Sequence, residues 1–330
     1  MPNTPDDTPT ATPDPASPID RAAHPLAAQV LDILQRRMFM LYKSTAQDSR
    51  SPLAERAPLL DRVAASLIRD QPADQVAGRL ERAVKGYIKM SLEFLRLQRQ
   101  LEKSGHYLLA SERDAYEQVY GHDGAYGEHG YYLDGLLLAL ALWPNHFEFW
   151  RYFQQDFIAA LGERARIVEI GVGTGFHLAE LLAARPEVRY TGIDISALAV
   201  DYCKRYVFGP AEPPAHVDFV VENVAAGLRA EDGSCDALIM GEVLEHIEDP
   251  AGALRELYRV AAPGAPLFMT TVVFAAAIDH IYMFEDAQSI RDLVATTGWR
   301  IDSERVLPVV AEDRPDMRKR PMNYAAVLRK

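Results

Sequence analysis

Acidic and imidazole side chains lie close together in the sequence G-E-V-L-E-H at residues 241–246. If this segment begins a helical turn, Glu242, Glu245 and His246 share one face, because residues three and four apart are neighbours on a helix. His280, in a later loop, is a fourth candidate for the same site. Carboxylates combined with imidazoles predict a site for a divalent cation that keeps open positions for substrate oxygens.

The same residues also suit catalysis without a metal. His246 is the natural general base, because the unperturbed pKa of histidine lies near working pH, and Glu245 and His280 would act beside it. A purely structural role is the third interpretation, since a single loop histidine more often makes a hydrogen bond than binds a ligand.

The elements that would position these residues begin with an apolar run that ends in three alternate glycines, Gly171, Gly173 and Gly175. This pattern predicts a buried strand, a tight turn and a following helix. Glycine permits positive φ and leaves the backbone open to a ligand. The spacing differs from the G-x-G-x-x-G of dinucleotide sites. Glu169, two residues before the turn, would repel a polyphosphate but suits a cationic amino group.

A second apolar run, at residues 188–193, ends in Asp194 and Ile195. In such folds an acid at the end of the second strand holds a ribose diol. Together the two motifs resemble motifs I and II of the class I S-adenosylmethionine (SAM) methyltransferases, and the resemblance extends from about residue 165 to the C-terminus. It implies SAM as the cofactor and an α/β fold, with a doubly wound, mostly parallel seven-stranded sheet.

The resemblance implies further site residues. Asn223, followed by Val224, ends the third predicted strand where the family usually carries an Asp that meets the adenine amino group, and Gly241 ends the fourth. The E-x-x-E-H sequence with a later loop histidine is similar to ubiquinone-biosynthesis O-methyltransferases and to the small-RNA 2′-O-methyltransferases, whose matching residues can hold a metal. There the metal orients vicinal oxygens and lowers the pKa of the attacking one.

The chain before the first strand has a different character. Residues 1–18 are rich in Pro, Thr, Asp and Ala, which predicts a disordered tail. Residues 19–155 are predicted as a helical domain, with helices at 59–69, 73–84 and 87–101, and residues 156–330 as the SAM-binding domain. The helical domain is expected to cover a substrate cavity or to form a homodimer contact.

Tyrosines, histidines and glycines are concentrated between Gly105 and Gly135. Aromatic side chains with a polar atom suit a mostly apolar pocket, and dense glycine predicts loops that wrap a ligand. Tyr126 and Tyr131 are predicted to contact the methionine end of the cofactor.

The chain has 330 residues and a net charge of −12 at pH 7. This charge argues against nucleic acid as a partner, because such binding depends on neutralised phosphates. Cys203 and Cys235 have no metal-type spacing and indicate no disulfide framework. The N-terminus lacks a secretory signal, and the longest apolar run, at 136–143, is too short to span a bilayer. We therefore predict a cytoplasmic protein without a membrane partner.

These observations together predict a SAM-dependent methyltransferase acting on a small molecule, for example in natural-product biosynthesis, with His246 as base or metal ligand. The first alternative is metal-assisted C-methylation of a 2-oxo acid. The second is a non-catalytic SAM-fold binding protein. A nicotinamide oxidoreductase is disfavoured by the glycine spacing and by Glu169.

Overall fold

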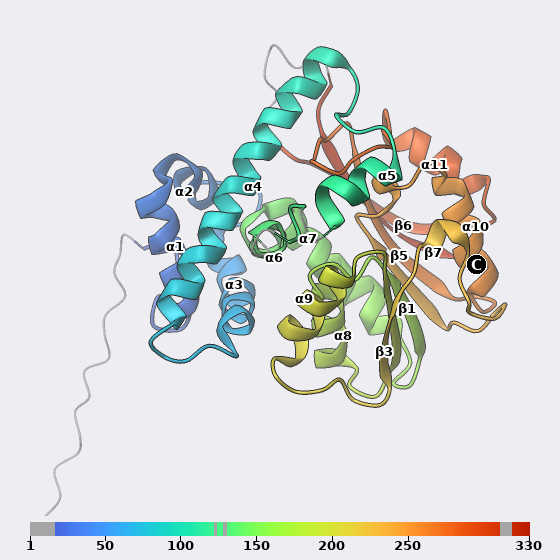
Figure 1. Ribbon diagram of the computed structural model, residues 1–330, viewed down its shortest axis with the longest axis horizontal. Coiled ribbons are helices and arrows are strands. Elements are labelled where there is room, and N and C mark those ends of the chain that lie inside the picture. The colour runs from blue at the N-terminus through green and yellow to red at the C-terminus, as the bar shows by residue number, and fades with distance from the viewer. Residues whose placement is uncertain (1–16, 122–123, 128–130, 311–318) are drawn as a thin grey trace, which may run out of the picture.

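A computed structural model describes residues 17–121, 124–127, 131–310 and 319–330. It has a helical region at the N-terminal end and an α/β region built on one sheet (Figure 1). The tail predicted at residues 1–18 lies almost entirely outside the described residues. No helix in the described part of the chain is long and apolar enough to cross a membrane.

The sheet has seven strands in the order β3-β2-β1-β4-β5-β7-β6. The first five are parallel, and β7 pairs antiparallel with both β5 and β6. The prediction of a mostly parallel seven-stranded sheet is therefore confirmed. The strands are Arg166–Ile170 (β1), Arg189–Asp194 (β2), Val217–Val221 (β3), Ala237–Gly241 (β4), Pro266–Val273 (β5), Arg300–Pro308 (β6) and Met322–Arg329 (β7).

Two helices of the α/β region begin at residues whose side chains cap them. Ser196 accepts a hydrogen bond from the backbone N–H of Ala199, and Asp249 accepts one from Gly252, as expected for N-cap side chains. The helices are Phe176–Ala184 (α8), Ala197–Phe208 (α9), Pro250–Val260 (α10) and Ala287–Ala295 (α11), with short turns at Val224–Ala226 (η4) and Leu244–His246 (η5).

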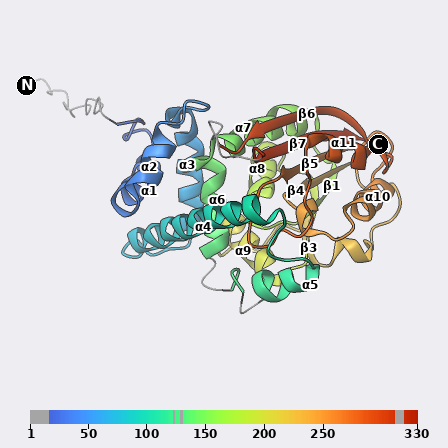
Figure 2. The ribbon, with the colours of Figure 1, turned by 90° about the horizontal axis from the view of Figure 1, so that it is seen from above.

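The helical region is dominated by the 29-residue helix α4, Val76–Ser104. Figure 2 shows α4 running from beside α1 and α3 toward the strands. The other elements are Pro25–Arg37 (α1), Phe39–Ala46 (α2), Leu53–Ile68 (α3), Glu112–Ala115 (α5), Tyr116–Tyr120 (η1), Tyr131–Leu142 (α6), Pro144–Tyr152 (α7), Phe153–Phe157 (η2) and Ile158–Ala160 (η3).

The structure corrects the prediction of two helices at 73–84 and 87–101, because one continuous helix occupies this stretch. Gly86 does not end the helix but lies at its crossing with α6. A Cβ at Gly86 would stand 2.5 Å from the backbone oxygen of Tyr131, and one at Gly135 would stand 3.0 Å from Met90 Sδ. These two glycines therefore allow close helix packing instead of forming loops.

Two buried carboxylates join the helical region to the α/β region. Asp134 on α6 accepts hydrogen bonds from Arg79 at 2.5 and 2.6 Å and from the hydroxyl of Tyr202 on α9 at 2.6 Å. Glu180 on α8 accepts from Trp150 at 2.7 Å and from Arg62 at 3.0 Å. Paired and hydrogen-bonded in this way, the buried charges fix the helical region against α8 and α9.

The C-terminal half of α4 also holds the loop that follows β5. The amide of Gln98 donates to the backbone oxygen of Phe274 at 3.1 Å and accepts from the backbone N–H of Ala276 at 2.9 Å. Both bonds are buried, and the loop continues to His280.

The helix crossing gives a testable prediction. The Gly86→Ala variant should lower the free energy of unfolding by about 1–3 kcal/mol, because the added methyl group meets backbone that cannot move cheaply. Gly78→Ala in the same helix is the matched control, since only the end of the Arg82 side chain lies near its Cβ position. Denaturant unfolding followed by circular dichroism measures both; equal stability of the two variants would contradict the crossing.

Candidate active site

A cavity of about 280 Å³ lies at the carboxyl ends of the parallel strands, where ligands bind in open α/β sheets. Its volume is close to the lower end of the roughly 300–1,000 Å³ range of small-molecule sites. The α/β region contributes the polar side chains and the glycine turn. The helical region contributes a mostly apolar wall that includes Met90, Phe94, Leu136, Leu140, Trp143, Phe149 and Trp150.

The glycine turn between β1 and α8 adopts the conformation that its sequence predicts. Gly171, Gly173 and Gly175 have φ values of 74°, 46° and 77°. A Cβ at Gly175 would stand 2.7 Å from Cys203 Sγ and one at Gly171 2.5 Å from Val243 Cγ2, so both positions need glycine for packing as well. Gly173 has open space around it, which leaves its backbone accessible from the cavity.

Asp194 ends β2 and borders the cavity together with Ile195. Its carboxylate accepts hydrogen bonds from the backbone N–H groups of Gly173 at 3.1 Å and Ser196 at 2.8 Å. Burial raises the pKa of Asp194 to about 6. Each oxygen retains a lone pair, so the group can accept hydrogen bonds from two hydroxyls of a diol.

Asn223 lies at the end of β3 and also borders the cavity, beside the buried Val224. Its side-chain oxygen accepts from the backbone of Ala225 at 2.9 Å, and its amide donates to Glu112 Oε2 at 3.3 Å. Glu112 on α5 also accepts from the backbone of Glu248 at 2.9 Å. Glu112 gave no signal in the sequence, because a four-residue helix is too short to show a periodic pattern.

All four residues of the acid and histidine group border the cavity, but their arrangement differs from the prediction. Glu242 has a φ of 53°, so it lies outside the helical turn of Leu244–His246 and shares no helical face with Glu245 and His246. Its backbone N–H donates to Thr270 instead. The groups that come together are Glu245, His246 and His280, whose ligand atoms lie within 4.8 Å of one another.

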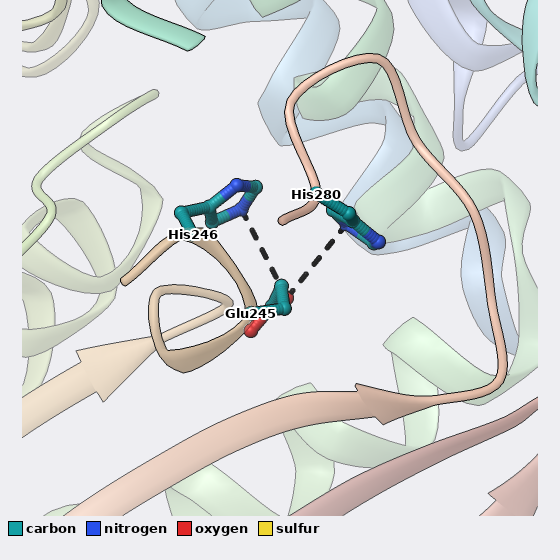
Figure 3. A group of neighbouring side chains, drawn as sticks. All are labelled: Glu245, His246 and His280. Atoms are coloured by element: carbon teal, nitrogen blue, oxygen red, sulfur yellow. Dashed lines mark ion pairs between the residues drawn. The ribbon is translucent and has the colours of Figure 1, made fainter. Parts of the chain in front are cut away.

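Backbone contacts orient the two imidazoles of this trio, whose side chains are drawn in Figure 3. Nδ1 of His246 lies 2.9 Å from the oxygen of Asp279, and Nδ1 of His280 lies 2.8 Å from that of Ala275. A carbonyl only accepts, so each Nδ1 carries the proton and each Nε2 presents a lone pair. Both Nε2 atoms lie 4.0 Å from Oε1 of Glu245, which stands between the two rings in Figure 3.

Burial shifts the pKa values of Glu242, Glu245 and His280 in the direction that favours their neutral forms. Burial, with repulsion from Glu245, raises the pKa of Glu242 to about 8, and burial raises that of Glu245 to about 7. Burial lowers the pKa of His280 to about 4. Oε1 of Glu242, Oε1 of Glu245 and Oδ1 of Asp279 are buried without a hydrogen-bond partner among the described residues. The candidate ligand atoms of Glu245, His246 and His280, which lie within 4.8 Å of one another, fit a bound cation.

The tyrosine predictions divide. Tyr126 borders the cavity, whereas Tyr131 does not: its hydroxyl donates to Glu93 at 3.3 Å and its ring lies under Lys89. Tyr132 and Tyr120 border the cavity instead, and the hydroxyl of Tyr120 donates to Asp279 at 3.2 Å. Adjacent tyrosines at the start of a helix point in different directions, which composition alone does not reveal.

Glu169 does not reach the cavity wall. It is 1% exposed, and its oxygens contact Nδ1 of His177 at 3.0 Å and the hydroxyl of Tyr190. His177 borders the cavity in its place. Glu169, the predicted partner of a cationic group, is therefore separated from the cavity by the imidazole of His177.

Residues 168–269 match the family described as "Methyltransferase domain". With the sheet order and the glycine turn described above, this match identifies the chain as carrying a class I SAM-dependent methyltransferase domain.

Curated relatives match over the same part of the chain. A ubiquinone biosynthesis O-methyltransferase of Xanthomonas oryzae pv. oryzae is 32% identical over 108 residues, 33% of this chain and 43% of that protein. One of Pectobacterium atrosepticum is 30% identical over 107 residues, 32% of this chain and 42% of that protein. The chain therefore spans less than half the length of these relatives.

Solved structures are similar at a lower level. A SAM-dependent methyltransferase from Methanosarcina mazei is 20% identical, covers 53% of this chain and 97% of its own, and has a TM-score of 0.43. A putative sarcosine dimethylglycine methyltransferase from Galdieria sulphuraria is 12% identical, covers 57% and 86%, and has a TM-score of 0.46. Scores this low support no statement about function.

The position of Asp194 yields a binding prediction. Asp194→Asn should weaken S-adenosylhomocysteine binding roughly 10- to 100-fold, because a charged acceptor for the ribose hydroxyls is lost. Asp218→Asn is the control, since Asp218 lies exposed on the neighbouring strand β3 and outside the cavity lining. Isothermal titration calorimetry measures both dissociation constants. An unchanged constant for Asp194→Asn would remove this residue from the cofactor site.

Proposed function

We propose that this chain transfers the methyl group of SAM to a small molecule bound in the cavity. The observation that carries the proposal is that one cavity joins the glycine turn and Asp194 to the trio of Glu245, His246 and His280. The first set suits a nucleoside cofactor, and the second suits deprotonation of an acceptor. A role in natural-product biosynthesis remains part of this proposal.

Methyl transfer from a sulfonium is an in-line displacement, so the protein must align the acceptor and exclude water. Trp143, Phe149 and Trp150 of the helical region serve both purposes, because they close the cavity with apolar surface. An acceptor with a high pKa must also lose a proton. Nε2 of His246 carries a lone pair, and the residue borders the cavity, so in the absence of a metal it can take that proton.

We further propose that Glu245, His246 and His280 hold a divalent cation. Their converging acceptors and the unpartnered oxygens of Glu242 and Asp279 support a metal over an unassisted base. A cation bound there would orient substrate oxygens and lower the pKa of the attacking one. C-methylation of a 2-oxo acid would need the same cation. Identification of the methylated product distinguishes this reaction from methylation of a hydroxyl group.

The proposal is tested with the full chain in two assays. Calorimetry with SAM and S-adenosylhomocysteine measures cofactor binding, and labelled SAM measures transfer to a panel of phenols, catechols and 2-oxo acids. Binding with transfer to one class supports the enzyme. Binding without transfer to any of these classes would favour the non-catalytic alternative, and no heat from folded protein with either ligand would overturn the proposal. The homodimer and the cytoplasmic location also remain proposals.

The cation site predicts metal binding that depends on the trio. Titration of chelator-treated protein with Mn²⁺, Mg²⁺ and Zn²⁺ should show one site for at least one of them. Glu245→Gln and His280→Ala should each weaken that binding at least tenfold, as loss of a ligand or its support does. His24→Ala, at the start of α1, is the control. If binding survives both trio variants unchanged, the metal lies elsewhere and His246 acts alone.

His246 itself gives a kinetic prediction. With the acceptor that the panel identifies, His246→Ala should lower kcat roughly 10²- to 10⁴-fold, because the variant loses either a ligand of the cation or, without a cation, the base. The dissociation constant of S-adenosylhomocysteine should stay within about threefold of the wild-type value, because the ring binds no part of the cofactor in this arrangement. Equal turnover would exclude His246 from the mechanism.

A further inference from the structure

We infer that His177 binds the α-ammonium group of the cofactor's methionine end, with Glu169 supporting the imidazole from behind. The inference rests on the proposed function, because it assigns a residue to the same cofactor. It differs from the sequence-based expectation, in which Glu169 contacts the ammonium group directly.

The first step is the direction of the cofactor across the sheet. The strand order β3-β2-β1-β4 places Asn223, Asp194 and the glycine turn side by side along one edge. With adenine at the end of β3 and ribose at the end of β2, the remaining part of the cofactor must extend over β1 toward β4. Gly241 ends β4, and His177 follows the glycine turn, so both lie where that part of the cofactor arrives.

The second step is the orientation of the imidazole. His177 is the second residue of α8, and its side chain is 22% exposed. Its ring packs against Phe153 and Phe268, with centroid separations of 4.8 and 5.9 Å. A Cβ at Gly241 would stand 2.6 Å from Cε1 of His177, so glycine at this position makes room for the ring. The ring is therefore held in one place at the cavity wall.

The third step is the hydrogen-bonding role of each ring nitrogen. Burial raises the pKa of the Tyr190 hydroxyl well above its ordinary range, so Tyr190 donates its proton to Glu169. The other oxygen of Glu169 accepts from Nδ1 of His177 at 3.0 Å. In the tautomer that donates from Nδ1, Nε2 of His177 carries a lone pair, to which an ammonium group in the cavity can donate.

A buried carboxylate lies behind the ring of His177. Glu169 is 1% exposed and does not border the cavity, so a ligand meets its charge only through His177. A carboxylate that accepts from one ring nitrogen fixes the tautomer and the orientation of the ring, as in the support of metal-bound histidines. His177 and Glu169 thus form a cation-accepting pair at the methionine end.

Three ligands separate this role from others. S-adenosylhomocysteine has both the ammonium and the carboxylate, its decarboxylated analogue keeps only the ammonium, and 5′-methylthioadenosine has neither. In calorimetry, His177→Phe should weaken the binding of S-adenosylhomocysteine and of its decarboxylated analogue about tenfold or more. The affinity for 5′-methylthioadenosine should stay unchanged. Glu169→Gln should act in the same direction with the ring still in place. His106→Phe, on an exposed loop residue, is the control for an added phenyl ring.

The outcomes are distinct. Loss of affinity for S-adenosylhomocysteine without loss for the decarboxylated analogue would mean that His177 binds the carboxylate, which overturns the inference. Equal loss for all three ligands, or no loss, overturns it as well. If the wild-type chain binds none of the three, the proposed function fails first. Should His177→Phe not fold, as judged by its unfolding transition, His177→Gln and Glu169→Gln give the same comparison.

Discussion

Parallel alignment of β1 with its two neighbours is the constraint on which the cavity depends. Ile170 of β1 is in register with Ile193 of β2 and with Met240 of β4, so the three strands end at the same level. Each of the three chain segments that follow therefore begins at the same edge. The backbone polar groups are satisfied within the sheet, which leaves the side chains beyond its edge free to face a ligand.

The helical region completes the cavity and packs directly against the helices that cover the sheet. Its hydrophobic core includes Phe176, Tyr202 and Tyr206 from α8 and α9, so one core continues across both regions. The charge-assisted bonds of Asp134 and Glu180 lie at this junction. In the described part of the chain, the helices thus behave as a fixed wall whose aromatic side chains define the space left for an acceptor.

Local sequence signals predicted the parts of the structure that local physics determines. The glycine turn and Asp194 were predictable because positive φ and a strand end are properties of a few consecutive residues. The prediction of a helix break near Gly86 was wrong, because this glycine allows a close contact with α6. The two contacting residues are too far apart in the sequence for a local pattern to reveal the contact.

The predictions that failed within the site depend on side-chain direction and on tertiary contacts. Glu242 and Glu245 are spaced for a helix, yet hydrogen bonds to Thr270 on β5 hold Glu242 at positive φ. Glu169 lies behind His177 because Tyr190, one strand away, takes its second oxygen. Neither relation can be derived without knowing which strands are neighbours.

The unbroken helix α4 acts as a strut across the molecule. Arg79 near its first turn donates hydrogen bonds to Asp134, and Gln98 near its C-terminal end donates one to the backbone oxygen of Phe274. At 1.5 Å per residue these anchors are about 28 Å apart. Because α4 is bound at both of these points, the position of the segment that carries His280 depends on contacts at the opposite end of the helix.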